Sequence, residues 1–222
     1  MKAMILAAGR GLRMGSLTQN SPKPLIKVKG KSLIEWHLNK LSEAGFRDVV
    51  VNVSYLSDKI IEFIGDGSKW KLNITISEEI EALETAGGIK KALKYLGAEP
   101  FVVINADIYS AYNYKNLEIK TLENKSMGYL VLVNNPNHNP EGDFGLLRNG
   151  CLTMHANSLL TFSGIAIYDP KLFSELTEGS KMKLSPILEN AINKNYIKGE
   201  LFDGEWSDIG TPERLNIINS KN

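Results

Sequence analysis

The chain has very little cysteine: Cys151 is the one thiol among its 222 residues. A lone cysteine excludes an intrachain disulfide and is typical of proteins in the reducing cytoplasm. It follows Asn149 and Gly150, a pair that favours a hairpin turn, and no basic partner that could activate it is evident. We therefore expect a cytoplasmic protein in which this thiol is not a nucleophile.

The sequence also lacks a long apolar run and an excess of charge of one sign. No apolar stretch reaches the roughly 18 residues of a membrane-spanning helix, and the first residues favour a core strand over a signal peptide. The net charge of +1 gives no strong field that would attract nucleic acid or an anionic membrane surface. The three histidines show no zinc-ligand spacing. These absences predict neither a nucleic-acid partner nor a membrane partner, and no metal site built from histidine.

The first half of the chain has instead an alternation of apolar strands and amphipathic helices. Continuous apolar runs are typical of buried parallel strands, and apolar residues on one face are typical of the helices that cover them. The expected strands are 2–7, 48–53, 72–77 and 101–105, and the expected helices are 32–44, 57–64 and 85–95. This order predicts an α/β fold with a Rossmann-like, mostly parallel sheet flanked by helices.

The second half has a different pattern, with short strands separated by turns. Strands are expected at 127–133, 144–148, 151–155 and 160–168, and helices at 184–193 and 212–218. The Asn- and Pro-rich segment 134–143 is expected to be a loop that overhangs the functional site. No repeat or interdomain linker is evident, so we predict a single domain, 1–222, with an antiparallel β excursion in its second half.

A glycine-rich turn with one cation follows the first expected strand. Gly9 and Gly11 allow a sharp turn that brings backbone N–H groups close to a ligand, and successive N–H groups form a concave anion site. Arg13 adds a planar, permanently charged guanidinium that suits phosphate oxygens. The turn is therefore predicted to hold a polyphosphate.

Two better-known phosphate loops do not fit the sequence. The dinucleotide pattern G-x-G-x-x-G would need a glycine where the chain has Met14. The Walker ending Gly-Lys-Ser occurs at 30–32, but its first glycine would fall on Leu25. We interpret 30–31 as a hairpin-like turn and Ser32 as the N-cap of the next helix.

Two charged residues are candidates for chemistry at the same edge of the sheet. Lys23 lies between Pro22 and Pro24, which stiffen the backbone and can aim the ammonium, although most loop lysines are simply solvated. Asp107 follows the strand 101–105, at the edge where open α/β sheets bind their ligands. A carboxylate at this place can bind Mg²⁺ that in turn binds the phosphates of a substrate. The alternative is that Asp107 only caps the next turn.

A second acid and a pair of glycines each have two interpretations. Asp208 precedes Thr211 and Pro212, which have the pattern of a helix N-cap and first helical residue. Asp208 is either a second metal ligand or an aid to the start of that helix. Gly87 and Gly88 allow either the close approach of a ligand to a helix N-terminus or close packing of helix on sheet.

Five segments that span nearly the whole chain carry a resemblance. They are 6–14 (LAAGRGLRM), 21–25 (SPKPL), 83–89 (LETAGGI), 105–107 (NAD) and 206–212 (WSDIGTP). Together they closely resemble the sugar-1-phosphate nucleotidyltransferases, or NDP-sugar pyrophosphorylases, and most of all the uridylyltransferase branch that acts on N-acetylmuramate 1-phosphate. The resemblance implies Mg²⁺-dependent transfer of a nucleotidyl group from an NTP, with UTP as first choice, to a sugar 1-phosphate.

The resemblance also implies a role for each matching position. It implies catalysis by Arg13, Lys23 and Asp107. It implies nucleotide binding by Ala8, Gly9, Gly11, Arg13, Lys23, Ala86, Gly87, Gly88 and Asn105. It implies sugar-phosphate binding by Lys23, Asp143, Gly145 and Gly164. It implies Mg²⁺ binding by Asp107 and Asp208. The NTP part would be about 1–110 and the sugar-phosphate part about 111–222, in a monomer or small homo-oligomer.

Some alternatives stay open at the level of the sequence. Ala106 stands where relatives usually have glycine, which bears on the contact with base or ribose. Mannose or glucose 1-phosphate with GTP, CTP or dTTP would use much the same backbone. A GT-A glycosyltransferase also places a carboxylate after a strand, but it does not need Arg13 and Lys23 around a triphosphate. A sensor that binds a nucleotide sugar without turnover is the remaining class.

Overall fold

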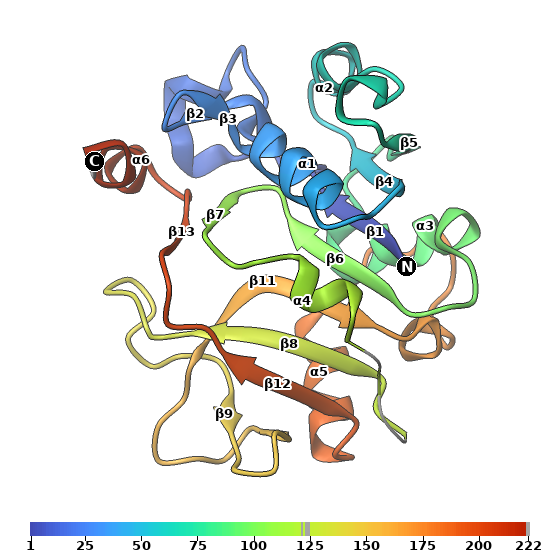
Figure 1. The fold of residues 1–222 in the computed structure, drawn as a ribbon, viewed down its shortest axis with the longest axis vertical. Helices are drawn as coiled ribbons and strands as arrows, with labels where there is room; N and C mark the ends of the chain where they lie inside the picture. The colour runs from blue at the N-terminus through green and yellow to red at the C-terminus, as the bar shows by residue number, and fades with distance from the viewer. Residues whose placement is uncertain (121, 123–124, 221–222) are drawn as a thin grey trace.

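The computed structural model describes residues 1–120, 122 and 125–220 and is built on one seven-stranded sheet (Figure 1). The sheet order is β12-β8-β11-β6-β1-β4-β5, and β11 runs antiparallel to both of its neighbours while the other pairs are parallel. The strands are β1 (Lys2–Leu6), β4 (Asp48–Val53), β5 (Asn73–Glu78), β6 (Phe101–Asn105), β8 (Gly128–Val133), β11 (Thr161–Tyr168) and β12 (Ile197–Leu201).

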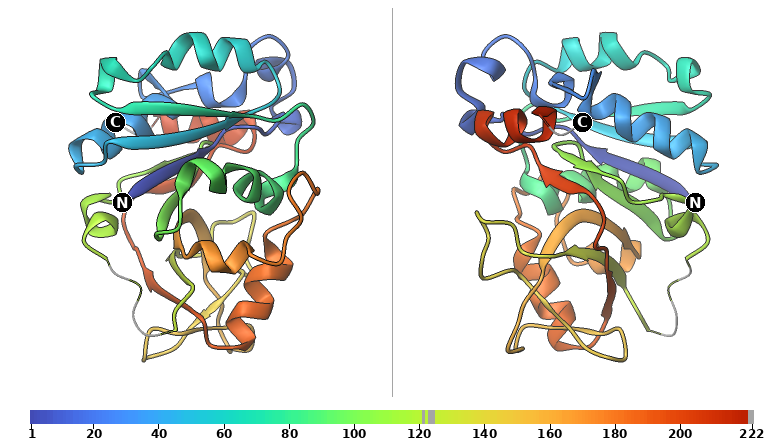
Figure 2. Two further views of the ribbon diagram at one scale, coloured as in Figure 1. Left: turned by 90° about the vertical axis from the view of Figure 1, so that its right-hand side faces the viewer. Right: turned by 60° about the vertical axis from the view of Figure 1, so that its left-hand side comes forward.

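Helices cover both faces of this sheet (Figure 2). On one face lie α1 (Leu33–Glu43), α2 (Ser57–Ile64) and the short α4 (Lys115–Glu118), and on the other lie α3 (Glu84–Leu96) and α5 (Ser185–Asn193). Successive strand residues alternate between the two apolar cores: Ala3 and Ile5 belong to the first and Met4 to the second. Because both faces are buried, central strands such as β6 are continuous apolar runs, and the expected α/β class is confirmed.

Local signals set the start of α1. The Ser32 hydroxyl accepts a hydrogen bond from the backbone N–H of Glu35 at 3.3 Å, which confirms the predicted N-cap. Just before it, β2 (Lys27–Val28) and β3 (Lys31–Ser32) form an antiparallel pair, so the predicted hairpin exists, with its turn at 29–30 and Lys31 already in β3. Gly30 and Lys31 thus belong to a hairpin, which agrees with the missing first glycine in excluding the Walker interpretation.

The second half departs from the pattern expected of it. The expected strands at 127–133 and 160–168 exist, but β8 and β11 join the main sheet next to β6. Only β9 (Gly145–Leu146) and β10 (Leu152–Thr153) form a separate hairpin, and each has two residues. The sequence analysis missed β12, an edge strand of the sheet. Its polar residues alternate with small or apolar ones, so it gives no strong apolar run.

The chain returns at its end to the loops that follow β1. Strand β13 (Trp206–Asp208) pairs with β7 (Ile108–Ser110), and α6 (Pro212–Ser220) follows it, as the predicted Thr-Pro start requires. A third apolar cluster joins α6 to this region through Met14, Val28 and Leu215. The 3₁₀ helices are η1 (Leu12–Thr18), η2 (Lys23–Leu25), η3 (Ser68–Trp70) and η4 (Pro170–Phe173). Residues from both ends of the sequence therefore meet at one edge of the sheet.

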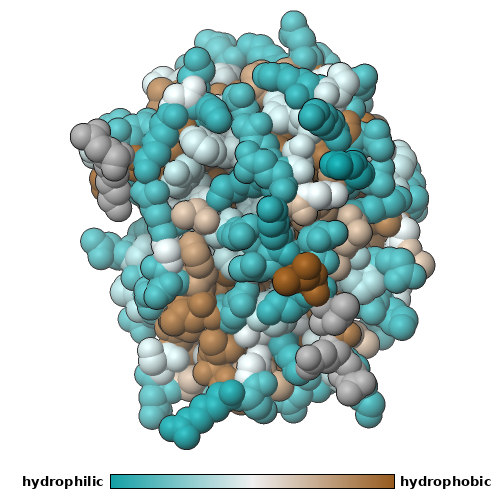
Figure 3. All heavy atoms as spheres, viewed as in Figure 1, coloured by the Kyte–Doolittle hydropathy of each residue, from teal (hydrophilic) through white to brown (hydrophobic). Residues whose placement is uncertain are grey.

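The outer surface is mainly polar on the face seen in Figure 3, with one apolar strip at the lower left. Within the described residues, no helix is both long enough and apolar enough to span a bilayer.

Candidate active site

A cavity of about 560 Å³ opens at the carboxyl ends of β1, β4 and β6. The chain passes from β1 to β4 and β5 on one side and then crosses to β6 on the other, so the strand order reverses beside β1. Ligands of open α/β sheets bind at such a switch point. The cavity is lined by backbone and side chains of the loop after β1, the segment before α3 and the end of β6.

The loop after β1 keeps its two glycines for different reasons. A Cβ at Gly9 would meet no heavy atom within 4 Å, so its backbone faces open space in the cavity. Gly11 has φ +64°, and a Cβ there would lie 3.1 Å from Cβ of Lys23. The hydroxyl of Thr18 donates to the Gly11 carbonyl at 3.0 Å and fixes this conformation. Gly11 thus lets the loop lie directly on the lysine side chain.

Lys23 is nearly buried and points at Asp107. Its side chain is 8 % exposed, and its Nζ lies 2.6 Å from Oδ2 of Asp107, which is 39 % exposed. Lys23 is the first residue of η2, in which the Leu25 N–H donates to the carbonyl of Pro22 at 2.9 Å. This short helix positions the lysine backbone. Arg13 also lines the cavity, and within the described residues no group bonds its guanidinium. One anchored cation and one unengaged cation therefore face the same space.

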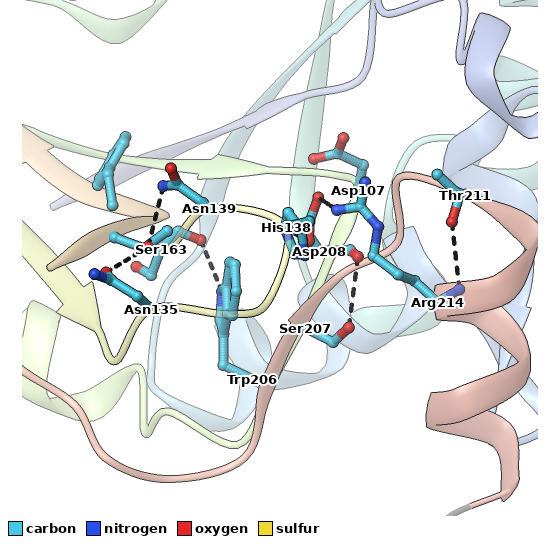
Figure 4. Close-up of polar contacts among 12 residues, drawn as sticks. Asp107, Asn135, His138, Asn139, Ser163, Trp206, Ser207, Asp208, Thr211 and Arg214 are labelled. Atoms are coloured by element: carbon cyan, nitrogen blue, oxygen red, sulfur yellow. Dashed lines mark hydrogen bonds and ion pairs between the residues drawn. The ribbon is translucent and has the colours of Figure 1, made fainter. Parts of the chain in front are cut away.

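Asp208 lies on the chain segment next to Asp107. The backbone N–H of Ile209 donates to the Asp107 carbonyl at 2.8 Å, at the point where β13 pairs with β7. In Figure 4 the two acids lie close together, with His138 and Arg214 around Asp208. Arg214, from the first turn of α6, donates to Oδ2 of Asp208. The predicted overhanging loop 134–143 supplies His138, whose Nε2 lies 2.8 Å from Oδ1 of Asp208.

This pair of acids fits a divalent cation that is also held by a substrate. Oδ1 of Asp208 is buried and accepts no hydrogen bond, although Nε2 of His138 lies 2.8 Å from it. Across the described residues, no group of three or more His, Cys, Asp or Glu side chains could hold a metal. Mg²⁺ commonly takes one or two carboxylates and completes its shell with phosphate oxygens and water. Asp107 and Asp208 match that requirement.

The other end of the cavity has polar residues that the sequence analysis missed. Asn52 and Glu79 line it from the ends of β4 and β5, and both are nearly buried. Glu84, the first residue of α3, also lines it with φ +61°, a left-handed conformation that is unusual for a residue other than glycine. The signal for Asn52 was present in the sequence as one amide inside the apolar run Val49–Val53.

Three predicted nucleotide-binding residues lie outside the cavity lining. The N–H groups of Ala86 and Gly87 donate to the carbonyl of Met182, at 3.0 and 3.2 Å. A Cβ at Gly87 would collide with the carbonyl oxygen of Ser180. A Cβ at Gly88 would lie 2.6 Å from Oε1 of Glu79. In this structure these glycines allow close packing of α3 on its neighbours.

Three of the predicted sugar-phosphate residues lie outside the cavity lining. Gly164, with φ +80°, sits at the irregularity in β11, and a Cβ there would lie 2.8 Å from Nδ2 of Asn105. A Cβ at Gly145 would lie 2.5 Å from Cβ of Ala156. Asp143 accepts a hydrogen bond from the N–H of Phe162 at 2.8 Å. Asp143, Gly145 and Gly164 are not part of the cavity lining, whereas Asn105 and Lys23, the fourth predicted sugar-phosphate residue, are.

The cleft at the switch point brings together two acids and two basic residues, an arrangement suited to binding phosphates, and comparison with known proteins shows the family. The chain belongs to the nucleotidyl transferase family, whose model matches residues 2–222. More narrowly, it is a sugar-1-phosphate nucleotidyltransferase.

Two curated relatives and one solved structure are among the most similar proteins. The chain is 44 % identical to the N-acetylmuramate alpha-1-phosphate uridylyltransferase of Neisseria meningitidis serogroup B, covering 97 % of this chain and 95 % of that one. It is 30 % identical to the enzyme of the same name from Caulobacter vibrioides, covering 95 % and 92 %. A Bacillus anthracis protein assigned as a glucose-1-phosphate thymidylyltransferase, solved with sucrose, has a TM-score of 0.86 at 22 % identity, covering 99 % and 94 %. This last similarity supports the fold.

Proposed function

We propose that the protein catalyses Mg²⁺-dependent transfer of the uridylyl group of UTP to N-acetylmuramic acid 1-phosphate, giving the UDP-sugar and pyrophosphate. The observation that carries the reaction class is the grouping of Lys23, Asp107 and Asp208 at one edge of the sheet. The choice of UTP and of this sugar rests on the 44 % identity to a relative of that name. Because UTP is a cytoplasmic metabolite, the reaction is also proposed to take place there.

The chemical problem is one of charge. A phosphate oxygen of the sugar 1-phosphate attacks the α-phosphorus of the NTP in line, the new P–O bond forms, and the bond to pyrophosphate breaks. The nucleophile is already an anion, so the reaction needs no general base. The enzyme has to bring two anions together and stabilise the charge of the transition state, which it does by positioning and electrostatics.

Each basic residue has a separate proposed task. Lys23 holds the sugar phosphate and the α-phosphate, because its ammonium is fixed beside Asp107. Arg13 holds the β- and γ-phosphates and the departing pyrophosphate, since its guanidinium lines the cavity without a protein partner among the described residues. Mg²⁺, held by Asp107 and Asp208, supplies neutralisation of phosphate charge when bound. The glycine turn offers backbone N–H groups at the same place.

A matrix of substrates tests this proposal. UTP, GTP, CTP and dTTP are each mixed with N-acetylmuramic acid, N-acetylglucosamine, glucose and mannose 1-phosphates and Mg²⁺, and pyrophosphate is measured. We expect the fastest release with UTP and N-acetylmuramic acid 1-phosphate. Fastest turnover of another pair would replace the proposed substrates, and no pyrophosphate with any pair would contradict the reaction itself. Release of a free nucleotide from a finished nucleotide sugar would instead indicate a glycosyltransferase.

A further inference from the structure

Asn52 and Glu79 form a hydrogen-bonded bridge between two backbone segments that line the cavity. The N–H of Ala7, in the loop after β1, donates to Oδ1 of Asn52 at 2.9 Å. Nδ2 of Asn52 donates to Oε1 of Glu79 at 2.7 Å, and Oε2 of Glu79 accepts from the N–H of Leu83 at 2.9 Å. Both polar atoms of the Asn52 side chain and both oxygens of the Glu79 side chain therefore take part in a hydrogen bond.

The bridge is buried and closely packed. Asn52 is 3 % exposed and Glu79 is 2 % exposed. Gly88 in α3 leaves the room that they occupy, since a Cβ there would lie 2.6 Å from Oε1 of Glu79 and 2.9 Å from Nδ2 of Asn52. A buried carboxylate is costly unless its oxygens are hydrogen-bonded. A carboxylate kept at this place thus points to a positional role.

The location of the bridge indicates what it positions. Strand order puts the ends of β4 and β5, with Asn52 and Glu79, on the side of β1 opposite to β6 and Asp107. If the phosphates lie near Lys23 and Asp107, the base lies toward the bridge. One end of the bridge holds the loop after β1, and the other holds the turn that leads into α3, where Ala82 and Glu84 line the cavity.

We propose that Asn52 and Glu79 are positioning residues that set the spacing of these two segments and so shape the end of the site that receives the base of the nucleotide. This inference deepens the proposed function and rests on it. Neither side chain is assigned to the chemistry. Their hydrogen bonds hold backbone groups of the loop and the turn where a flat base can fit between them.

The direction of the hydrogen bonds gives a sharp test. In Glu79→Gln, an NH₂ group replaces one carboxylate oxygen. Whichever way the two amides are oriented, one NH₂ group then faces another N–H donor and one hydrogen bond of the bridge is lost. In Asn52→Asp, two carboxylates face each other. The double variant N52D/E79Q restores the sequence of donors and acceptors, because the acid now lies at position 52 and its second oxygen accepts from the new amide at position 79. The three variants differ from the wild type in polarity but hardly in shape.

The measurements are the Kd for the nucleotide by calorimetry with Mg²⁺, and KM and kcat for both substrates. Each single variant is expected to weaken nucleotide binding about tenfold, as expected when a buried hydrogen bond is lost, with the KM for the sugar phosphate unchanged. The double variant is expected to return within about threefold of the wild type. Tyr114→Phe is the matched control, since it removes another buried hydrogen bond, the one between Tyr114 Oη and His37 Nδ1, outside the cavity.

Two results would overturn the proposal: wild-type nucleotide affinity in E79Q, or a double variant no better than the worse single one. If E79Q does not fold, Gly88→Ala takes its place, because its Cβ would push into the same bridge. Unchanged nucleotide affinity in that variant would equally contradict us. The assay uses whichever NTP the wild type turns over, so a wrong base in the proposed function is seen in the wild type and leaves the test of the bridge intact.

Discussion

At the scale of single residues, Lys23 combines near-complete burial with a direct contact to an acid. Its Nζ lies 2.6 Å from Oδ2 of Asp107. Burying the charge of a lysine without such a partner would cost stability. The same side chain supports the glycine loop, because it lies under Gly11. A residue that serves both purposes tolerates little change.

Lys23→Ala is predicted to lower kcat by about 10²-fold or more, the scale of losing one oriented charge-stabilising group. Pyrophosphate release at saturating substrates measures this effect. Lys27→Ala is the matched control, because Lys27 is an exposed lysine of β2 only four positions away. A kcat within about threefold of wild type in the Lys23 variant would refute the role assigned to this ammonium.

His37 gives a pH-dependent stability. Burial lowers its pKa from 6.5 to about 4, and the nearby Lys40 charge adds to the shift. Its Nδ1 lies 2.8 Å from the hydroxyl of Tyr114. Between pH 6.5 and pH 4 the unfolded chain binds a proton at this ring that the folded chain does not, so stability falls as the pH is lowered through this window.

The free energy of unfolding is therefore predicted to fall by about 2 kcal/mol between pH 7.5 and pH 5 on account of His37 alone. Urea unfolding at the two pH values measures this change. The same measurement on His37→Gln gives the contribution of the carboxyl groups that titrate in this pH range, which is then subtracted. The change in the free energy of unfolding between the two pH values should be about 2 kcal/mol smaller in that variant. An equal pH dependence in both proteins would mean that folding does not lower the pKa of His37.

At the scale of elements, the two glycines of the loop after β1 are expected to differ in role. Gly11→Ala places a Cβ at φ +64° and 3.1 Å from the Lys23 side chain, so it is predicted to lower stability by about 1 kcal/mol or more and to lower kcat. Gly9→Ala meets no atom within 4 Å and should leave stability unchanged. We expect it to raise the KM for the NTP if a phosphate approaches that backbone.

Thermal unfolding and steady-state kinetics of the two variants test this contrast. Equal stability losses would show that Gly9 is structural as well. An unchanged KM in Gly9→Ala would place the phosphates elsewhere along the loop.

The same scale shows what could be predicted from the sequence. Strands buried on both faces, such as β6 with its run Phe101–Ile104, are uninterrupted apolar runs, and their order with the helices predicted the parallel half of the sheet. The edge strand β12 was missed because Lys198 and Glu200 alternate with its small or apolar residues, so the strand has no continuous apolar run. The strands β8 and β11 were placed in a separate excursion because nothing local in their sequences tells which sheet edge they join.

At the scale of the whole molecule, the predicted site depends on segments far apart in the chain. Lys23 and Asp107 could be placed together because strand ends of one sheet meet at one edge. The contacts of Asp208 with Arg214 and His138 could not be predicted, since they follow from how α6 and the loop 134–143 pack. The Asn52–Glu79 bridge likewise requires the adjacency of β4 and β5 and the direction of two side chains.

The central claim is that Asp107 and Asp208 share one cation in this cleft, and the Mg²⁺ dependence of pyrophosphate release tests it most directly. Asp208→Asn is compared with Asp203→Asn, the same substitution at an exposed acid five residues earlier in the chain. We predict that the Mg²⁺ concentration for half-maximal rate rises about tenfold or more in the first variant and stays at the wild-type value in the second. A wild-type Mg²⁺ dependence in Asp208→Asn would contradict the account.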